Sequence, residues 1–157
     1  MKKYLLILGC SNRKKSVSGK VRPLELYDGV NYRVLKKFFK MYGKPSNLEI
    51  LIISAKYGFL TMGEIIEHYD KKMTAERARE LHDTVMKKLK AFLKGKEFDE
   101  VHINLGKTYL EAIGGFERLF PNSKIVYDER GIGYKMQTMK KWLERIGDEV
   151  TKCNANG

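Results

Sequence analysis

Three short apolar segments, far apart along the chain, constrain its fold more than any other feature of the sequence. Each is about as long as a strand buried on both faces, ends in a small polar turn, and is followed by residues with helical periodicity. This alternation predicts a parallel β-sheet whose strands are connected by helices. Because the carboxyl ends of parallel strands meet at one edge, where ligands bind, we expect the three turns to form one site. The segments are residues 4–8, 50–53 and 101–104.

The chain as a whole fits an α/β class, as a single three-layer α/β/α domain with a mostly parallel, Rossmann-like sheet of about four strands. With 157 residues, 43% of them hydrophobic, it can bury one core. We expect the domain to span residues 1–150 and residues 151–157 to form a frayed tail. Residues 124–127 are the expected fourth strand, and residues 59–73 look irregular. Helices are expected in residues 23–42, 75–93 (with Thr74 as N-cap), 107–113 and 136–146.

The positive charge is concentrated in the first part of the chain. The formal net charge is +12; residues 1–44 contain 12 Lys/Arg and 2 Asp/Glu, whereas the remaining 113 residues contain 19 and 17. A basic excess confined to one segment favours a phosphate-bearing ligand or nucleic acid as partner. The alternative is a solvated helix face, since Lys36, Lys37 and Lys40 fall on one side of a helix.

Cysteine and hydropathy patterns favour a cytoplasmic location. Cys10 and Cys153 do not form a CxxC pair, and a chain of this size needs no disulfide. The start of the chain imitates a lipoprotein signal, but its apolar run of about five residues is shorter than the 7–15 that a signal core needs. No segment approaches transmembrane length. The three histidines lack metal-ligand spacing, so we expect no metal and no cofactor.

The first turn, residues 10–14, contains small residues that allow a ligand to approach the backbone. Its N–H groups can surround an anion, and Ser11 and Lys14 are candidate ligand contacts. Cys10 is a candidate nucleophile, or simply a small buried hydrophobe. The turn is not a P-loop, because GxxxxGK[ST] is absent.

The second turn, residues 54–60, places a lysine between a buried strand and an aromatic residue. We expect the Lys56 ammonium to point into the crevice, where it would bind phosphate or act as a base. Tyr57 either stacks on a base or caps the core. Ser54, Gly58 and Tyr69 are further candidate contacts, and Asp70 is the candidate general base.

Two further glycine-containing turns precede expected helices. Gly106 with Tyr109, and Gly133 with Gln137, can present backbone N–H groups to an anion. Each of these turns is a weak signal alone, because glycine is also common before helices for steric reasons.

At these motifs the chain resembles a small domain-of-unknown-function family of archaea, bacteria and phages that is related to the peroxide-stress YaaA-like proteins. The resemblance rests on Cys-Ser-x-x-Lys at residues 10–14 and Ser-Ala-Lys-Tyr-Gly at residues 54–58. The first motif also resembles a turn in the catalytic domain of archaeosine synthase, where Pro-Tyr-Ser follows; here residues 15–17 are Lys-Ser-Val. The resemblance implies an α/β fold and a role in nucleobase or nucleic-acid processing.

Two functions remain open from the sequence. The first is an enzyme that modifies a nucleotide, nucleobase or nucleic acid, with its site at the carboxyl ends of the strands. The second is a non-catalytic nucleic-acid-binding domain that uses the basic residues 2–44. An enzyme requires the polar turns to gather in one concave pocket, whereas a binding domain requires an exposed basic face.

Overall fold

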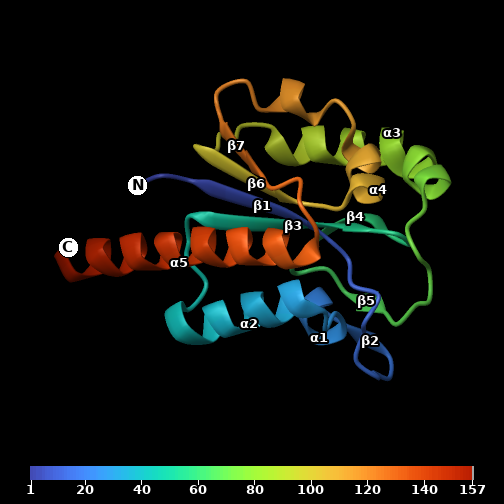
Figure 1. Cartoon of the computed structure of the whole chain (residues 1–157), viewed down its shortest axis with the longest axis horizontal. Helices are drawn as coiled ribbons and strands as arrows, with labels where there is room; N and C mark the ends of the chain where they lie inside the picture. Colours follow the sequence, from blue (N-terminus) through green and yellow to red (C-terminus); the bar gives the residue numbers. More distant parts are fainter. Residues whose placement is uncertain (157) are drawn as a thin grey trace.

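The computed structural model describes residues 1–156 and has a five-stranded sheet at its centre, with helices on both faces (Figure 1). The strand order is β4-β3-β1-β6-β7, and a separate two-stranded sheet pairs β2 with β5. This confirms the predicted three-layer α/β domain. The strands are β1 (Tyr4–Gly9), β2 (Lys20–Val21), β3 (Leu48–Ser54), β4 (Gly58–Thr61), β5 (Ile66–Glu67), β6 (Glu100–Asn104) and β7 (Lys124–Tyr127).

The three apolar segments are adjacent parallel strands, as predicted. The central strand β1 pairs in parallel with β3 on one side and with β6 on the other, and β7 extends the sheet in parallel beyond β6. Leu8 of β1 lies opposite both Ile52 and Asn104, so the three strands end at nearly the same level. Their carboxyl ends therefore form one continuous edge.

The side chains of β1 alternate between two hydrophobic cores. Leu6 and Leu8 face the layer of α2 (Val30–Tyr42) and α5 (Ile132–Asn156), and Leu5 and Ile7 face the layer of α3 (Ala75–Leu93). All four leucine and isoleucine side chains are fully buried. This period-two pattern on a strand buried on both faces is what the continuous apolar run predicts.

The helix α3 begins where its capping residue predicts, whereas α5 begins at Ile132, before the expected residue 136. Thr74 is the N-cap of α3, and its hydroxyl accepts a hydrogen bond from the Arg77 backbone N–H at 3.0 Å. The expected helix after β6 forms as α4 (Lys107–Leu110) followed by two short 3₁₀ turns, η1 (Glu111–Ile113) and η2 (Phe116–Leu119). The expected helix in residues 23–42 is interrupted, and forms α1 (Pro23–Leu26) and α2.

Two further regions differ from the sequence expectation. Residues 59–73 include β4, which pairs antiparallel with β3 through a tight turn in which Gly58 has a φ of +74°. Residues 151–156, expected as a frayed tail, continue α5 instead; Gly157 lies outside the described residues.

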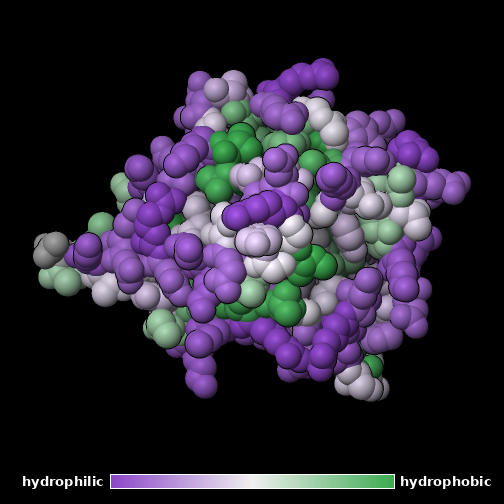
Figure 2. All heavy atoms as spheres, in the orientation of Figure 1, coloured by the Kyte–Doolittle hydropathy of each residue, from purple (hydrophilic) through white to green (hydrophobic). Residues whose placement is uncertain are grey.

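Hydrophilic side chains cover most of the surface visible in Figure 2, with apolar patches between them. Within the described residues, none of the helices is both long and apolar enough to cross a membrane.

Candidate functional site

A cleft of about 360 Å³ opens at the carboxyl ends of β1 and β6. The turns that follow these two strands line it together with the first residues of α2 and α5, so two of the three predicted turns do converge. Among the sequence candidates, Cys10, Ser11, Gly106 and Tyr109 line this cleft; Arg13, Asn31, Asn104 and Lys135 are further lining residues.

The walls of the cleft come closest together at two glycines. A Cβ atom at Gly29 would lie 2.4 Å from the Ser11 Oγ, so only glycine lets α2 begin this close to the first turn. A Cβ atom at Gly9 would lie 3.2 Å from the Tyr109 ring, which covers the end of β1. The Tyr32 hydroxyl donates a hydrogen bond to the Gly9 carbonyl at 2.6 Å.

The electrostatic character of the cleft is positive. Two cationic side chains, Arg13 and Lys135, line it, and no Asp or Glu is found among its described lining residues. Arg13 also lies 3.7 Å from the Asp28 carboxylate, so Lys135 is the cation of the cleft that has no acidic partner in the described structure. The amino ends of two long helices contribute as well, through Val30 and Asn31 of α2 and Ile132 of α5. Helix amino ends carry free N–H groups and a partial positive charge, which suits an anion.

Lys135 is unusual among the lysines because its side chain is buried, with 7% relative exposure. Its ammonium donates to the Asp128 carbonyl oxygen and lies 4.4 Å from the centroid of the Tyr127 ring. In the described structure no carboxylate forms an ion pair with it; the Asp128 carboxylate is instead bound by Arg130 and Thr138. A buried ammonium with spare donors and no counter-ion favours an anionic ligand.

Two asparagine side chains add neutral polar groups to the same cleft. The Oδ1 atom of Asn31 is buried and accepts no hydrogen bond from any described residue. Asn104, at the end of β6, is buried and donates from Nδ2 to the Met139 sulfur at 3.3 Å. A buried acceptor without a partner is costly, so a hydrogen-bond donor in the cleft would stabilise an Asn31 side chain that turned toward it.

The candidate nucleophile is in contact with a tyrosine. The Cys10 Sγ lies 3.2 Å from the Tyr109 hydroxyl, and Cys10 is partly exposed in the cleft. Burial and the neighbouring Cys10 raise the pKa of Tyr109 above its usual value. The Tyr109 hydroxyl therefore stays protonated at neutral pH and can donate a hydrogen bond to the sulfur or to a ligand.

The second turn forms a separate group beside the cleft, centred on Tyr69. The Tyr69 hydroxyl is 2.7 Å from that of Tyr27 and 2.9 Å from the Ser54 Oγ. The Ser54 Oγ also accepts from the backbone N–H groups of Lys56 and Tyr57. Burial raises the pKa of Tyr69, so this network consists of neutral hydroxyls and serves to fix the turn.

Lys14 and Lys56 come together over this network. The Lys14 Nζ lies 4.5 Å from the centroid of the Tyr69 ring, and the Lys56 Nζ lies 6.0 Å from the same centroid. The expectation that Lys56 is withdrawn from solvent was wrong: the residue is exposed, because β4 folds back on β3 and leaves the turn between them on the surface. Neither lysine lines the cleft.

The remaining candidates lie elsewhere. Asp70 is exposed and outside the cleft. Gly58 packs against α3, with its would-be Cβ 3.3 Å from Val85. Gln137 lines a different groove, between α2 and α5, and Gly133 is an exposed residue of the first turn of α5. The structure therefore separates these four from the cleft.

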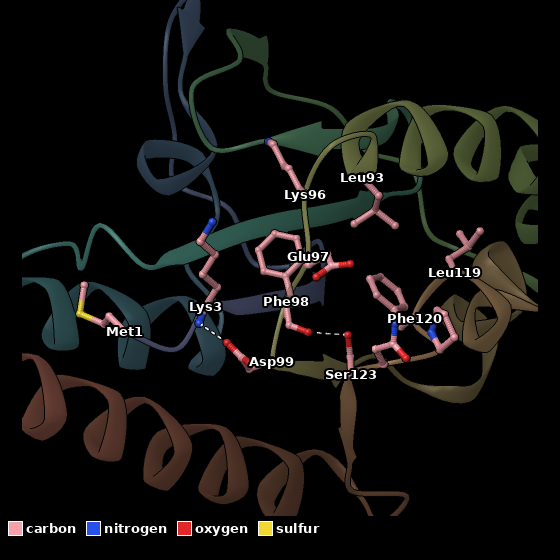
Figure 3. Close-up of a pocket in the computed structure, with 12 residues that line it drawn as sticks. Met1, Lys3, Leu93, Lys96, Glu97, Phe98, Asp99, Leu119, Phe120 and Ser123 are labelled. Atoms are coloured by element: carbon pink, nitrogen blue, oxygen red, sulfur yellow. Dashed lines mark hydrogen bonds between the residues drawn. The ribbon is translucent and has the colours of Figure 1, made fainter.

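Another cavity of about 400 Å³ lies at the opposite edge of the sheet (Figure 3). It is lined by residues that precede β1, β6 and β7, among them Lys3, Asp99 and Ser123. Ser123 donates to the Phe98 carbonyl, and the Lys3 backbone N–H to the Asp99 carboxylate, so its polar groups are occupied in holding loops. Ligands of open α/β sheets bind at the carboxyl edge, so the first cleft is the candidate functional site.

Metal ligation has no geometric support within the described residues. No group of three or more His, Cys, Asp and Glu side chains is placed there to hold an ion. His102 is fully buried in β6 beside Trp142, with ring centroids 4.9 Å apart, and its Nδ1 has no hydrogen-bond partner among the described residues. Desolvation lowers the pKa of His102 to about 4, so the ring is neutral.

Comparisons with known proteins show the family and the fold. The sequence matches the family described as "Family of unknown function (DUF6884)" over residues 5–141, and the chain belongs to this family. Its fold is similar to that of the solved structure described as "Crystal structure of AF0587, a protein of unknown function", with a TM-score of 0.55 and 17% identity. The match covers 91% of this chain and 45% of that one, so this chain spans less than half of its length. The search of curated proteins found no match.

Proposed function

We propose that the protein is an enzyme that modifies a nucleotide, a nucleobase or a nucleic acid, and that it binds the phosphate of its substrate in the cleft at the carboxyl ends of β1 and β6. The observation that carries this proposal is the charge of the cleft. Buried Lys135, which has no carboxylate partner in the described structure, and the amino ends of α2 and α5 line it. Arg13, paired with Asp28, lines it as well, and no acidic residue does so in the described set. Its volume of about 360 Å³ is within the usual range of small-ligand sites.

The neutral groups in the cleft support a substrate with a nucleobase. The Asn31 side chain lines the cleft, and amide side chains commonly recognise base edges by hydrogen bonding. Val30 and Ile132 are unusually exposed apolar residues at the same cleft, with 49% and 72% exposure, and offer surface to a planar ring. The resemblance of residues 10–14 to the archaeosine synthase turn supports the same substrate class.

Catalysis is assigned to Cys10 and Tyr109. Cys10 is a partly exposed free thiol that lines the cleft, and so is placed to act as a nucleophile on a bound substrate. Tyr109, kept protonated by its raised pKa, would donate a hydrogen bond to the reacting group. Both cysteines are free thiols, in keeping with a protein that works in a reducing cytoplasm.

The direct test combines binding with product analysis. Calorimetry should detect saturable binding of a nucleoside monophosphate, and Lys135→Met should remove it while thermal unfolding verifies that the variant is folded. Lys94→Met, an exposed lysine beyond the end of α3, is the charge-matched control.

Mass spectrometry of a nucleotide or oligonucleotide after incubation should then detect a modified product that disappears with Cys10→Ala. Binding without any product would favour the non-catalytic alternative, and absence of binding would contradict the proposal.

A further inference from the structure

We infer that the substrate is a single-stranded nucleic acid whose backbone leaves the cleft across the end of β1 and is held by Lys14 and Lys56 over the Tyr69 ring. This inference rests on the proposed function, and adds that the ligand is a strand and not a free mononucleotide.

The two lysines converge on one fixed aromatic ring. Tyr69 is 6% exposed, and its hydroxyl is held between those of Tyr27 and Ser54. Lys14 comes from the loop after β1 and Lys56 from the β3–β4 turn, yet both ammonium groups lie within 6.0 Å of the centroid of this ring. Two distant segments thus present positive charge at one place.

Both backbone segments that carry these lysines are held in position. Lys14 forms a β-bridge with Tyr27, and the next residue, Lys15, donates to the Leu26 carbonyl at 2.8 Å. On the other side, Arg77 of α3 donates to the carbonyl oxygens of Ala55 and Lys56 at 2.7 and 3.1 Å. The backbone positions of the two lysines are therefore fixed before a ligand binds, which lowers the entropic cost of ordering the two segments.

No acid neutralises this pair within the described structure. Other cations nearby are paired: Arg13, Arg33 and Lys36 all lie within 4 Å of Asp28. By contrast, neither Lys14 nor Lys56 forms an ion pair with a described carboxylate. Two ammonium groups next to the same ring repel each other, and an anion bound beside that ring would be attracted to both.

The position of the pair relative to the cleft indicates a chain-like ligand. Lys14 directly follows Arg13, which lines the cleft. The cleft lies at the ends of β1 and β6, and the turn with Lys56 follows β3, on the other side of β1. Neighbouring strands lie about 4.8 Å apart, so the pair is roughly 5–10 Å along the sheet edge from the cleft. Figure 1 shows the loop after β1 running beside the segment of β5, and β2 pairs with β5 there. In this arrangement, the phosphate in the cleft and a second phosphate over Tyr69 are successive phosphates of one nucleic-acid strand.

A single strand suits this arrangement better than a duplex. A base must leave the stack to enter a recessed cleft, which is least costly when it is unpaired. Partly exposed Tyr57, whose hydroxyl accepts from the Glu67 N–H, offers an aromatic surface beside the lysines, as single-strand-binding proteins do.

The experiment compares one-phosphate and many-phosphate probes. Fluorescence anisotropy with labelled ten-nucleotide DNA and RNA single strands, and calorimetry with nucleoside monophosphates, are carried out on the wild type, Lys14→Met/Lys56→Met and the Lys94→Met control. The wild type should bind the oligonucleotide more tightly than the monophosphate, and the double variant should lose most of that difference. The slope of log K against log salt for the oligonucleotide should fall by about 0.7 per lysine, since about that many counterions are released for each phosphate contact on a single strand.

Equal affinity for mononucleotide and oligonucleotide, a preference for duplex, or unchanged oligonucleotide affinity in the double variant would overturn the inference. Failure of the proposed cleft site has a different signature. In that case Lys135→Met would leave both affinities unchanged, while the oligonucleotide would still depend on Lys14 and Lys56.

Discussion

The Cys10 thiol lies 3.2 Å from the Tyr109 hydroxyl, and this contact joins the end of β1 to the start of α4 across the cleft. Cys153, on the last turns of α5, is exposed and remote from the sheet edge. A ligand in the cleft can therefore protect Cys10 from alkylation, whereas it cannot cover Cys153. We expect a bound nucleotide to slow alkylation of Cys10 by iodoacetamide severalfold and to leave Cys153 unaffected, as measured by peptide mass spectrometry. Equal labelling of Cys10 with and without the nucleotide would remove this thiol from the binding site.

Replacing Gly29 tests the close approach of the two cleft walls. In Gly29→Ala the new Cβ would meet the Ser11 Oγ at 2.4 Å, so the first turn or the start of α2 must move. We expect a loss of about 1–3 kcal/mol in the free energy of unfolding, as for other overpacked sites. Gly63→Ala has no atom within 4 Å of its Cβ and should change stability by less than about 0.5 kcal/mol. Urea denaturation of both variants measures the difference; similar stabilities would mean that the contact relaxes freely.

Removing the Tyr69 hydroxyl tests the network beneath the lysine pair. Tyr69→Phe leaves the buried Tyr27 hydroxyl without a side-chain partner and should destabilise the fold by about 1–3 kcal/mol. Tyr134→Phe is the matched control, because Tyr134 is 58% exposed and should be close to neutral. If the two variants unfolded at the same urea concentration, the hydroxyl network would have no structural role.

Acid should destabilise the protein through His102. Burial lowers its pKa to about 4 from an unfolded value of 6.5, so between these values the unfolded chain binds more protons than the folded one. The contribution of neutral His102 to the free energy of unfolding should therefore be fully present above pH 6.5. It should decrease as the pH falls toward 4, by at most about 1.4 kcal/mol per pH unit. The hydrogen bond to the Gly114 carbonyl raises the pKa of His82. Through His82 the free energy of unfolding therefore decreases as the pH rises above 6.5, which is the opposite of the His102 effect.

The variant His102→Phe isolates this effect. It should flatten the dependence of unfolding free energy on pH between about 4.5 and 6.5, whatever its effect on absolute stability. The carboxylates with lowered pKa values, such as Glu100, contribute mainly near and below pH 4.5, and they contribute equally in the wild type and the variant. A slope identical to that of the wild type would mean that His102 is already charged or accessible in the folded protein.

Strand identity and direction were predictable because burial on both faces leaves a continuous apolar run. β1, β3 and β6 show this run, and the crossover helices between them require parallel pairing. The strand β4 was not predictable, since Gly58–Thr61 gains its burial from pairing with β3 and from packing on α3, which are contacts distant in sequence. The same hairpin explains why Lys56 is exposed.

The cleft was only partly predictable. Strand ends pointed to Cys10, Ser11 and Gly106, but the walls supplied by α2 and α5 depend on how these helices pack over the sheet. Lys135 carried a usable signal: it precedes Met139 by four residues and so falls on the buried stripe of α5. A lysine on an apolar helix face is a candidate for a buried functional group.

The most direct test of the account is a titration of ¹⁵N-labelled protein with a nucleoside monophosphate, followed by amide chemical shifts. We expect saturable shifts at the backbone N–H groups that surround the cleft, namely those of Cys10, Asn31, Gly106 and Ile132, and their loss in Lys135→Met. Shifts confined to exposed lysine segments without saturation, or shifts at the opposite edge around Asp99 and Ser123, would contradict a phosphate site at the carboxyl ends of β1 and β6.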